Sequence, residues 1–462
     1  MPVKKGQIIE IDVQDMAFGG KGLARIDGMA VFVDQAVAGD RVAARIIRKR
    51  KQYAEARVLK LMTPSPDRIA APCPYSGYCG GCKWQFLRYA KQLEYKRRHV
   101  ADSLRHIGRL EDVNVHPTLP ADPIFGYRNK MEFSCADRRW LLPAEMGRDD
   151  LDTSFALGLH VPGTFYKVLD TEACLLQPDL GNTLLGMVRC EMRRSGRPAY
   201  GLRSHEGFWR FLMLRHSVVH DRWMVNLITA EEDTALLKPL AARIIEAHPQ
   251  VAAVVNNVTT RKAAVAFGEY EVPLAGDACL RDGIGPYEFQ ISANSFFQTN
   301  TRSARVLYET AKTYARLTGS EIVMDLYCGT GTIAIFMAEG AREVVGIEMT
   351  ESAIQDARRN CRLNGVDNCR FVAGDVRRLL PTLTALPDVM VIDPPRDGMH
   401  KDVVAQVKTR APKRIIYVSC NPATLARDIA LLKENYHLAE VQPVDMFPHT
   451  WHIEAVARLE AR

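Results

Sequence analysis

Long apolar runs are missing from the 462-residue sequence: no window approaches the roughly 18 uncharged apolar residues that a membrane-spanning helix needs. The first residues, Met1 to Gly6, lead directly into a polar, acidic segment, so the apolar core of a signal peptide is missing as well. Internal repeats and low-complexity tracts are also lacking. We therefore expect a cytoplasmic protein with no membrane partner, and nothing in the sequence indicates an obligate protein partner.

The composition is that of an ordinary globular protein, with 47% hydrophobic and 25% charged residues. A chain of this length suggests about three domains. The net charge of +7 is modest, but its sign suits a polyanionic partner. The basic excess is concentrated in the segment Arg41–Lys51 and in the triplet Lys96–Arg98. Either cluster could equally be solvated surface.

The start of the chain predicts a small β-barrel, which we place at residues 1–62. Short strands are expected at residues 7–11, 30–33 and 41–47, with glycine turns between them. A small barrel that carries a basic strand is a common way to bind a nucleic-acid backbone. The segment at residues 62–66 contains two prolines and predicts a linker.

Residues 71–285 mix helical and strand patterns and predict a central α+β domain. A helix with a basic face is expected at about 85–107, and this helix could pack on the catalytic domain. A strand is expected at 218–229.

The last domain, at residues 286–462, has the pattern of a Rossmann-like α/β fold. From residue 321 onward, apolar runs alternate with helical segments, which is typical of a parallel sheet covered by helices on both faces. The expected strands lie at 321–327, 343–349, 388–393 and 414–419, the helices at 332–339, 351–364 and 423–435, and two closing strands at 436–447 and 452–459.

A cofactor site is expected where these parallel strands end. The segment Asp325–Thr332 ends the first strand and opens a helix, and its glycines let the backbone approach a ligand. Glu348 closes the second strand, where a carboxylate can accept both hydroxyls of an adenosine ribose. Asp375 and Asp393 follow the third and fourth strands. Acidic groups therefore line the whole edge of the sheet.

Two cofactors fit the glycine turn. The spacing of Gly329, Gly331 and Ala334 also matches a dinucleotide fingerprint, but no nicotinamide or flavin pocket follows it. S-adenosylmethionine has no phosphates, and its cationic sulfonium suits an acid-lined site. The pattern favours a methyltransferase, with an NAD-linked iron–sulfur oxidoreductase as the alternative.

Cys420 is the candidate nucleophile because it follows the fifth strand at the same edge of the sheet. C5 of uracil is a poor nucleophile, and a thiolate that adds to C6 turns it into an enolate able to attack a sulfonium methyl. A base must then remove the C5 proton, and Glu454 at the start of the last strand is the candidate. A buried structural cysteine and an exposed strand carboxylate are the alternative interpretations.

The fourth strand indicates which atom is methylated. Arg396 follows Asp393-Pro394-Pro395, where amino-group methyltransferases usually place an aromatic residue. RNA cytosine-C5 enzymes carry a second cysteine after this strand, and none is present here. Uracil C5 is the target that remains.

The C-terminal third resembles the bacterial RNA (uracil-C5)-methyltransferase family, specifically its 23S ribosomal RNA branch. The motifs that carry the resemblance are Phe297–Asn300, Asp325–Gly331, Asp393–Arg396, Ser419–Asp428 and His452–Glu454. The N-terminal sixty residues resemble a TRAM domain, an RNA-binding barrel related to the OB-fold. A transfer-RNA uridine methyltransferase is the alternative within the same class.

The resemblance implies a class I methyltransferase domain with Cys420 as nucleophile and Glu454 as proton acceptor. It places the cofactor S-adenosylmethionine among Gln298, Tyr327, Glu348, Asp375 and Asp393. Phe296 or Phe297 would stack on bases near a flipped uridine, although core packing would explain either ring equally well.

The eleven cysteines include a C-x5-C-x2-C run formed by Cys73, Cys79 and Cys82. In a reducing compartment such a run indicates a metal site, and its spacing permits zinc or an iron–sulfur cluster. The family resemblance implies a 4Fe-4S cluster in the central domain, with Cys174 as fourth ligand and a structural or RNA-positioning role.

Overall fold

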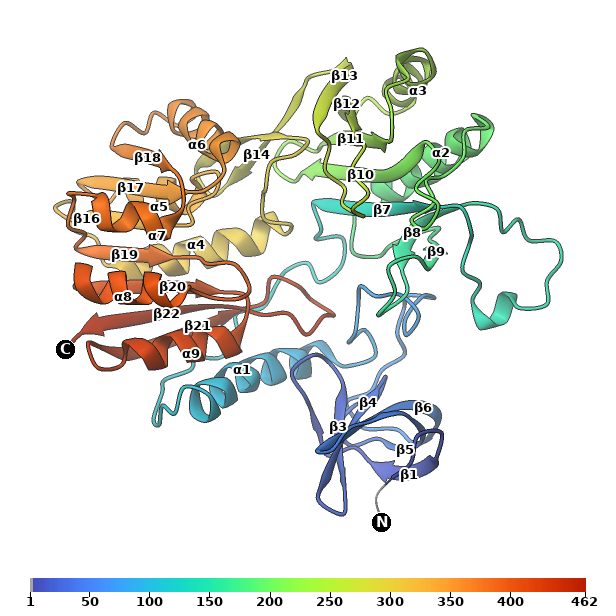
Figure 1. Ribbon diagram of the computed structural model, residues 1–462, viewed down its shortest axis with the longest axis horizontal. Coiled ribbons are helices and arrows are strands. Elements are labelled where there is room, and N and C mark those ends of the chain that lie inside the picture. The colour runs from blue at the N-terminus through green and yellow to red at the C-terminus, as the bar shows by residue number, and fades with distance from the viewer. Residues whose placement is uncertain (1–2) are drawn as a thin grey trace.

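The computed structural model describes residues 3–462, whose strands form three large sheets and one separate hairpin (Figure 1). None of the described helices is long and apolar enough to cross a membrane.

The N-terminal sheet has six strands in the order β1-β5-β6-β4-β3-β2. Their bounds are β1 Ile8–Asp12, β2 Asp15–Met16, β3 Gly22–Ile26, β4 Met29–Asp34, β5 Arg41–Lys49 and β6 Tyr53–Thr63. Strand β5 alternates between the two faces of the sheet: Val42, Ala44 and Ile46 are buried, and Arg41 and Arg45 are exposed. The basic segment predicted from the sequence therefore buries its apolar positions and presents its arginines to solvent.

The central domain is built on a seven-stranded sheet in the order β13-β12-β11-β10-β7-β8-β9. Its strands are β7 Lys130–Ala136, β8 Ala156–His160, β9 Val168–Asp170, β10 Trp209–Ser217, β11 Arg222–Thr229, β12 Val251–Val258 and β13 Tyr270–Gly276. Helices α2 (Asp179–Arg194) and α3 (Thr234–Ala247) pack their apolar stripes on this sheet, and a short 3₁₀ turn spans Pro143–Glu145.

The single strand expected at 218–229 is wrong in its first part. Residues 218–221 form the turn of a hairpin between β10 and β11, and Asp221 adopts a left-handed φ of 47°. Aspartate tolerates this conformation better than most residues. The turn therefore contains no glycine that would have indicated it in the sequence.

The C-terminal sheet has the order β18-β17-β16-β19-β20-β22-β21, in which β18 to β20 are parallel and β22 is antiparallel to its neighbours. The strands are β16 Ile322–Leu326, β17 Glu343–Glu348, β18 Cys369–Ala373, β19 Val389–Ile392, β20 Arg414–Ser419, β21 Tyr436–Val444 and β22 Glu454–Ala461. Its helices are α4 Thr301–Ala315, α5 Thr332–Ala338, α6 Glu351–Leu363, α7 Val376–Leu379, α8 Lys401–Arg410 and α9 Pro422–Leu432, with a 3₁₀ turn at Leu380–Thr382.

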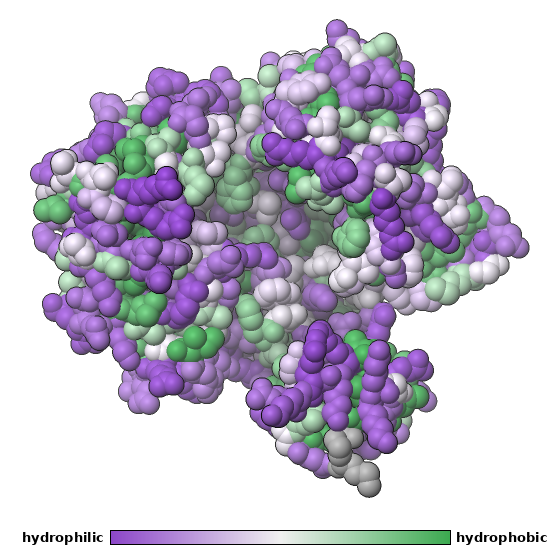
Figure 2. Space-filling view, viewed as in Figure 1, coloured by the Kyte–Doolittle hydropathy of each residue, from purple (hydrophilic) through white to green (hydrophobic). Residues whose placement is uncertain are grey.

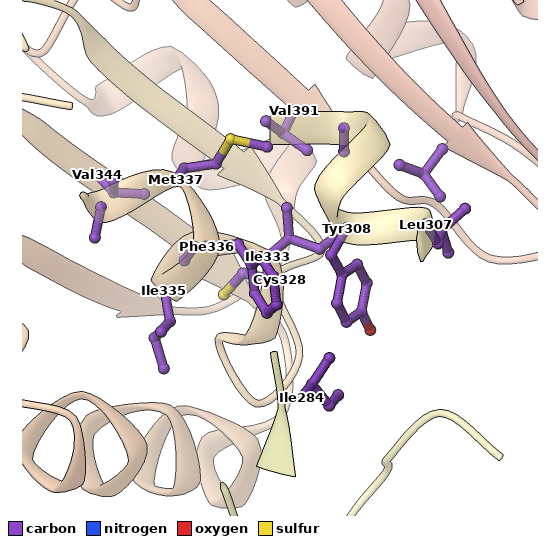
Figure 3. Close-up of a cluster of buried hydrophobic side chains, with 14 of the residues drawn as sticks. Ile284, Leu307, Tyr308, Cys328, Ile333, Ile335, Phe336, Met337, Val344 and Val391 are labelled. Atoms are coloured by element: carbon purple, nitrogen blue, oxygen red, sulfur yellow. The ribbon is translucent and has the colours of Figure 1, made fainter. Parts of the chain in front are cut away.

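The two faces of this sheet have separate cores. Helices α4, α5 and α6 cover one face, and Figure 3 shows Leu307 and Tyr308 of α4 beside Ile333 and Phe336 of α5 in that core. Helices α7, α8 and α9 cover the other face, together with α1 (Tyr89–His106) from the first quarter of the chain. Figure 1 shows α1 beside α9, although α9 lies near the other end of the chain.

The hairpin of β14 (Cys279–Ile284) and β15 (Tyr287–Ser292) joins the central and C-terminal domains. Strand β14 contacts the central strands β10, β11 and β12, whereas β15 contacts α6 of the C-terminal domain. The boundary expected between residues 285 and 286 falls in the turn of this hairpin.

A buried ion pair holds α1 on the C-terminal domain. Lys96 Nζ lies 2.6 Å from Asp445 Oδ1, and neither side chain is exposed to solvent. The same ammonium donates to the carbonyl of Phe447 at 3.0 Å, and the hydroxyl of Tyr89 donates to Asp445 Oδ2 at 2.8 Å. Every polar atom of the pair therefore has a partner that offsets part of the cost of desolvation.

The interpretation of the basic triplet Lys96–Arg98 as surface is wrong for Lys96, which is buried, whereas Arg97 and Arg98 are exposed. Lys96 is buried, Arg97 donates to the carbonyl of Val115 at 2.9 Å, and Arg98 pairs with Asp15 of the N-terminal sheet. The triplet ties α1 to its neighbours on two sides. A one-dimensional charge pattern cannot distinguish such internal pairs from a surface patch.

We predict that Lys96→Met destabilises the protein by about 3–5 kcal/mol, because it leaves the buried carboxylate of Asp445 without a counter-charge. The measurement is unfolding in urea, followed by circular dichroism. Lys91→Met on the same helix is the matched control, since water screens its pair with Glu94 and the loss of that pair should hardly change stability. Equal losses in the two variants would contradict the structural importance of the pair.

Candidate active site

The structure brings the predicted side chains together at one edge of the C-terminal sheet. Parallel strands β16 to β20 end at this edge, and the antiparallel strand β22 begins there. The strand ends and the residues that follow them place Tyr327, Glu348, Asp375, Asp393 and Cys420 along the edge, and Glu454 stands at the start of β22.

The glycine turn after β16 has a left-handed backbone at Tyr327, Gly329 and Gly331, with φ values of 65°, 53° and 78°. A Cβ on Gly331 would come within 2.9 Å of Ala357 and 3.1 Å of Phe371, so glycine is needed for α5 to pack against α6 and β18. A Cβ on Gly329 would meet nothing within 4 Å, and this part of the turn faces open space. Such a turn leaves room for a ligand beside an exposed backbone.

Glu348 is held against this turn. Its Oε2 accepts from the backbone N–H of Gly329 at 3.3 Å and its Oε1 from that of Thr350 at 2.9 Å. Each carboxylate oxygen retains a lone pair for a further donor. Glu348 can therefore accept a ligand hydroxyl while it is fixed in place.

Asp325 lies fully buried beneath the site. Within the described residues, neither carboxylate oxygen of Asp325 has a hydrogen-bond partner. Burial, followed by the neighbouring charge of Asp393, raises the pKa of Asp325 well above its usual value. Burial also raises the pKa of Asp393 to about 7. A cationic ligand would compensate these carboxylates, so this acidic edge suits the sulfonium of S-adenosylmethionine.

Asp375 and Tyr327 lie side by side at the outer part of the edge. The carboxylate of Asp375 accepts from the backbone N–H of Arg377 at 2.9 Å and also binds its guanidinium, which lowers the pKa of Asp375 to about 2. Burial, with a smaller contribution from Asp375, raises the pKa of the Tyr327 hydroxyl to about 12. At neutral pH these two groups are a carboxylate and a neutral phenol.

Gln298 forms a hydrogen bond with Tyr308, a site residue that the sequence analysis missed. Burial and the charge of Asp393 raise the pKa of the Tyr308 hydroxyl, and hydrogen bonds with Thr332 and Gln298 oppose this shift. Tyr308 lies on the buried face of α4, and its ring packs on Phe336 with ring centroids 5.3 Å apart. Only the tertiary structure places its hydroxyl among the polar site residues.

The loop that carries Cys420 is joined to the loop after β19. Asn421 caps α9 by accepting from the backbone N–H of Ala423 at 3.1 Å, and its Nδ2 donates to the carbonyl of Arg396 at 3.0 Å. The hydroxyl of Thr424 donates to the same carbonyl at 3.2 Å. The motif after the cysteine thus positions Arg396.

Two further motif residues complete this link. Arg427 donates to the carbonyls of Asp397 at 2.8 Å and Met399 at 3.2 Å. Asp428 is fully buried and accepts from the backbone N–H of Met399 at 2.7 Å and from the hydroxyl of Tyr417 at 2.6 Å. These bonds hold the loop at residues 396–399 beside Cys420.

Cys420, Glu454 and Arg396 form one electrostatic group. Burial, followed by the charge of Glu454, raises the pKa of Cys420 to about 11, whereas Arg396 lowers it. Burial, followed by Asp393, raises the pKa of Glu454 well above its usual value, and Arg396 again opposes the shift. In the free protein at neutral pH the thiol is therefore protonated, and the environment of Glu454 favours its protonated form. Sequence reasoning used Arg396 only to identify the target atom and missed its effect on the thiol.

The segment between β21 and β22 leads to Glu454 and touches the other domains. The carbonyl of His449 accepts from the backbone N–H groups of Lys83 at 3.0 Å and Trp84 at 2.9 Å. The ring of Trp451 packs edge-on against Phe18 of the N-terminal domain, with centroids 4.8 Å apart. Figure 2 shows a hollow in the molecular surface where the domains meet.

The predicted metal site is not confirmed. Within residues 3–462, no group of three or more His, Cys, Asp or Glu side chains is arranged to hold a metal ion, so the structure supports neither the zinc site nor the iron–sulfur cluster. The four predicted ligands nevertheless lie close enough to affect one another. Burial, with smaller contributions from Cys174, Cys79 and Cys73, raises the pKa of Cys82 to about 12.

The sheet order, the glycine turn and the acidic strand ends define the class I methyltransferase fold. Residues 317–446 match the family model of a methyltransferase domain, and residues 2–59 match that of a TRAM domain.

Full-length relatives are found among bacterial proteins. An uncharacterized RNA methyltransferase from Chlorobaculum tepidum is 44% identical over 99% of this chain and 97% of the relative. One from Halalkalibacterium halodurans is 38% identical over 100% of this chain and 98% of the relative. Among solved structures, the tRNA (uracil-54, C5)-methyltransferase of Pyrococcus abyssi, in complex with S-adenosyl-L-homocysteine, superposes with a TM-score of 0.76 at 27% identity. That match covers 98% of this chain and 100% of the other.

The chain therefore belongs to a family of RNA methyltransferases with an N-terminal TRAM domain. The alternative of an NAD-linked oxidoreductase is wrong, since a methyltransferase uses the same glycine turn for a different cofactor.

We predict that Arg396→Met slows alkylation of Cys420 by iodoacetamide at pH 8 by roughly three- to tenfold, because loss of the nearby cation disfavours the thiolate. The rate is measured by mass spectrometry of the Cys420 peptide as a function of pH. Lys401→Met, an exposed substitution at the start of α8, is the control. An unchanged pH profile in Arg396→Met would show that Arg396 does not act on the thiol.

Proposed function

We propose that this enzyme transfers a methyl group from S-adenosylmethionine to C5 of a uridine in RNA, through a covalent bond between Cys420 and C6 of the base. The observation that carries the proposal is the placement of Cys420 beside Glu454 and Arg396, next to the acidic cofactor pocket. The similarity over almost the whole chain to a tRNA (uracil-54, C5)-methyltransferase supports it.

Each residue then has a defined part in the reaction. The thiol of Cys420 loses its proton, with Arg396 stabilising the thiolate, and the sulfur adds to C6 so that the C5–C6 electron pair becomes nucleophilic at C5. The bound cofactor supplies an electrophilic methyl group on a sulfonium. Glu454, as a carboxylate, takes the C5 proton; the electrons re-form the C5–C6 double bond, and the sulfur of Cys420 leaves.

The two adjacent phenylalanines have different environments. Phe297 is buried and packs against Phe289 with ring centroids 6.0 Å apart, so core packing explains it. Phe296 is 68% exposed immediately before the segment that carries Gln298. We therefore assign the stacking role to Phe296, which would contact a base beside the flipped uridine.

The N-terminal domain presents an unneutralised basic surface. Arg45 of β5 and Arg57 of β6 are exposed and directly opposite each other in the antiparallel register. Neither forms an ion pair with any described residue. Like charges in this arrangement repel, and a phosphate backbone would neutralise them. This surface supports RNA as the partner.

Ribosomal and transfer RNA remain the two candidate substrates. The resemblance of the motifs favours 23S ribosomal RNA, and the printed substrate of the similar Pyrococcus abyssi enzyme favours transfer RNA. Both RNAs therefore belong in the test of the reaction.

We predict that RNA containing 5-fluorouridine forms an adduct with the enzyme that survives denaturing electrophoresis in the presence of S-adenosylmethionine. Fluorine at C5 cannot leave as a cation, so the sulfur cannot be expelled. Transcripts of 23S ribosomal RNA and of transfer RNA are compared. Cys420→Ala should abolish the adduct, and Cys190→Ala, an exposed cysteine outside the site, should leave it intact.

Glu454→Gln provides an independent arm of the same experiment. Without the base, unmodified uridine should be methylated and then stay bound to Cys420, so the adduct accumulates with ordinary RNA. Absence of any adduct with both RNAs would remove the uracil-C5 assignment and leave only the cofactor site.

For the cysteine group we propose a 4Fe-4S cluster held by Cys73, Cys79, Cys82 and Cys174. The support is the motif spacing together with the mutual electrostatic effect of the four thiols. Each ligand of such a cluster binds a different iron, so the sulfurs need not converge on one ion.

Cys73→Ser should remove the brown chromophore and the bound iron and sulfide from anaerobically purified protein, and it should destabilise the central domain. Cys190→Ser is the control. A wild-type protein without iron, or an undiminished iron content in Cys73→Ser, would remove the cluster assignment.

A further inference from the structure

A cavity of about 600 Å³ lies in the central domain, away from the methyltransferase edge. It is formed at the carboxyl end of β7, by the loop that follows this strand and by segments before β9 and β10, with Arg138, Trp140, Tyr166, Lys167, Tyr200 and Arg203 in its lining. Figure 1 shows the loop between β7 and β8 projecting beyond the central sheet. We call this space the β7 cavity. Its volume is in the range of a ligand-binding site.

The aromatic rings of the β7 cavity have cations placed over them. Lys167 Nζ lies 3.8 Å from the centroid of the Trp140 ring, and Arg203 Cζ lies 4.0 Å from that of Tyr166. Trp140 and Tyr166 are 39% and 37% exposed, whereas most aromatic side chains are largely buried. Each ring therefore retains surface on which a planar group can stack.

Three of the four cations of the β7 cavity lack acidic partners. In the chain from residue 3 onward, Arg138, Lys167 and Arg203 form no ion pair, and Asp137 is the acidic residue in the lining. The fourth cation, Arg139, differs because it pairs with Glu145 and Asp170. Arg139 thus supports the wall of the cavity, while the charges of Arg138, Lys167 and Arg203 are available to an anion.

Hydrogen bonds and ion pairs fix the segments that carry the rings and cations of the β7 cavity. The backbone N–H of Trp140 donates to the carbonyl of Val168 at 2.9 Å, and that of Arg139 to the carbonyl of Thr153 at 3.0 Å. Asp170, the last residue of β9, forms ion pairs with Arg189 at 3.0 Å and Arg193 at 3.3 Å, which anchor β9 to α2. The rings and cations are therefore placed before any ligand arrives, which lowers the entropic cost of binding.

We propose that the β7 cavity is a second RNA-binding site, which holds a single-stranded segment at a distance from the methylated uridine. Bases would stack on Trp140 and Tyr166, and phosphates would bind Arg138 and Arg203. Rings interleaved with unpaired cations are the features that bind single-stranded nucleic acid without sequence preference. The proposal extends the proposed function, because the segment belongs to the same RNA.

The separation of the two sites follows from the length of β7. Asn129, just before β7, donates to the carbonyl of Gln298 at 2.8 Å, and Cys135 near the other end of the strand lines the cavity. Six residues of extended strand span about 20 Å. An RNA must therefore extend several nucleotides beyond the target to reach the β7 cavity.

The first test is photo-cross-linking of the full-length enzyme to single-stranded RNA that contains 5-bromouridine, followed by mass spectrometry of the linked peptides. We expect links to peptides that contain Trp140 or Tyr166. Links confined to the N-terminal domain and to the neighbourhood of Phe296 would overturn the proposal. This readout does not depend on methyl transfer, so it stands even if the uracil-C5 assignment fails.

The second test measures RNA affinity by fluorescence anisotropy with a short and a long oligoribonucleotide. Trp140→Ala should weaken binding of the long RNA by roughly tenfold, within the range expected for loss of one stacked base, and leave the short RNA unaffected. The double variant Arg138→Glu/Arg203→Glu should weaken the long RNA and reduce the salt dependence of its binding. Lys238→Glu on α3, an exposed lysine of the same domain, is the matched control.

Three results would overturn the assignment. The first is that Trp140→Ala and the control bind the long RNA with equal affinity. The second is that the enzyme binds 5′-UMP as tightly as the long RNA. The third is that the cavity variants weaken the binding of an acidic peptide and leave the binding of RNA unchanged. In methylation assays, a pocket variant should raise KM for long RNA and leave kcat unchanged. A fall in kcat with unchanged KM would indicate a structural effect on the catalytic domain.

Discussion

The buried pair between Lys96 and Asp445 is the interaction on which the arrangement of the domains depends. Neither side chain reaches solvent, so each charge is tolerable only in the presence of the other. The pair docks a helix from the first quarter of the chain on the C-terminal sheet. It also fixes the segment after β21, which packs Trp451 on the N-terminal domain and then leads to Glu454. The same bonds thus hold the basic barrel and the candidate catalytic carboxylate in one frame.

The candidate active site concentrates carboxyl groups where little water can solvate them. Burial raises the pKa values of Asp325, Asp393 and Glu454, so the pocket is predisposed to accept positive charge. In the proposed reaction the cofactor loses its positive charge when the methyl group leaves, and its attraction to the pocket weakens with it. Arg396 acts in the opposite direction on the thiol of Cys420. The motif residues from Asn421 to Asp428 serve largely to hold this arginine in place.

Recognition of RNA would then be distributed over three separate surfaces. The exposed arginines of β5 and β6, the ring of Phe296 and the β7 cavity come from three parts of the chain. Contacts linked through one RNA reinforce one another, because each bound segment raises the effective concentration of the next. Such an arrangement gives affinity without demanding that any one surface bind tightly.

The sequence by itself determined the parts of this protein that depend on local pattern. Strand and helix alternation predicted the C-terminal sheet, and order along the chain predicted which side chains follow its strands, because parallel strands end at a common edge. The family was evident from the motifs between Phe297 and Glu454. Tertiary structure decided what depends on contacts between distant segments. It showed that Lys96 of a basic triplet is buried, that Tyr308 of an apolar stripe reaches the site, and that Phe296 is exposed while Phe297 is not. Charge and hydropathy along a chain record what a side chain is, whereas burial and partners are set by residues hundreds of positions away.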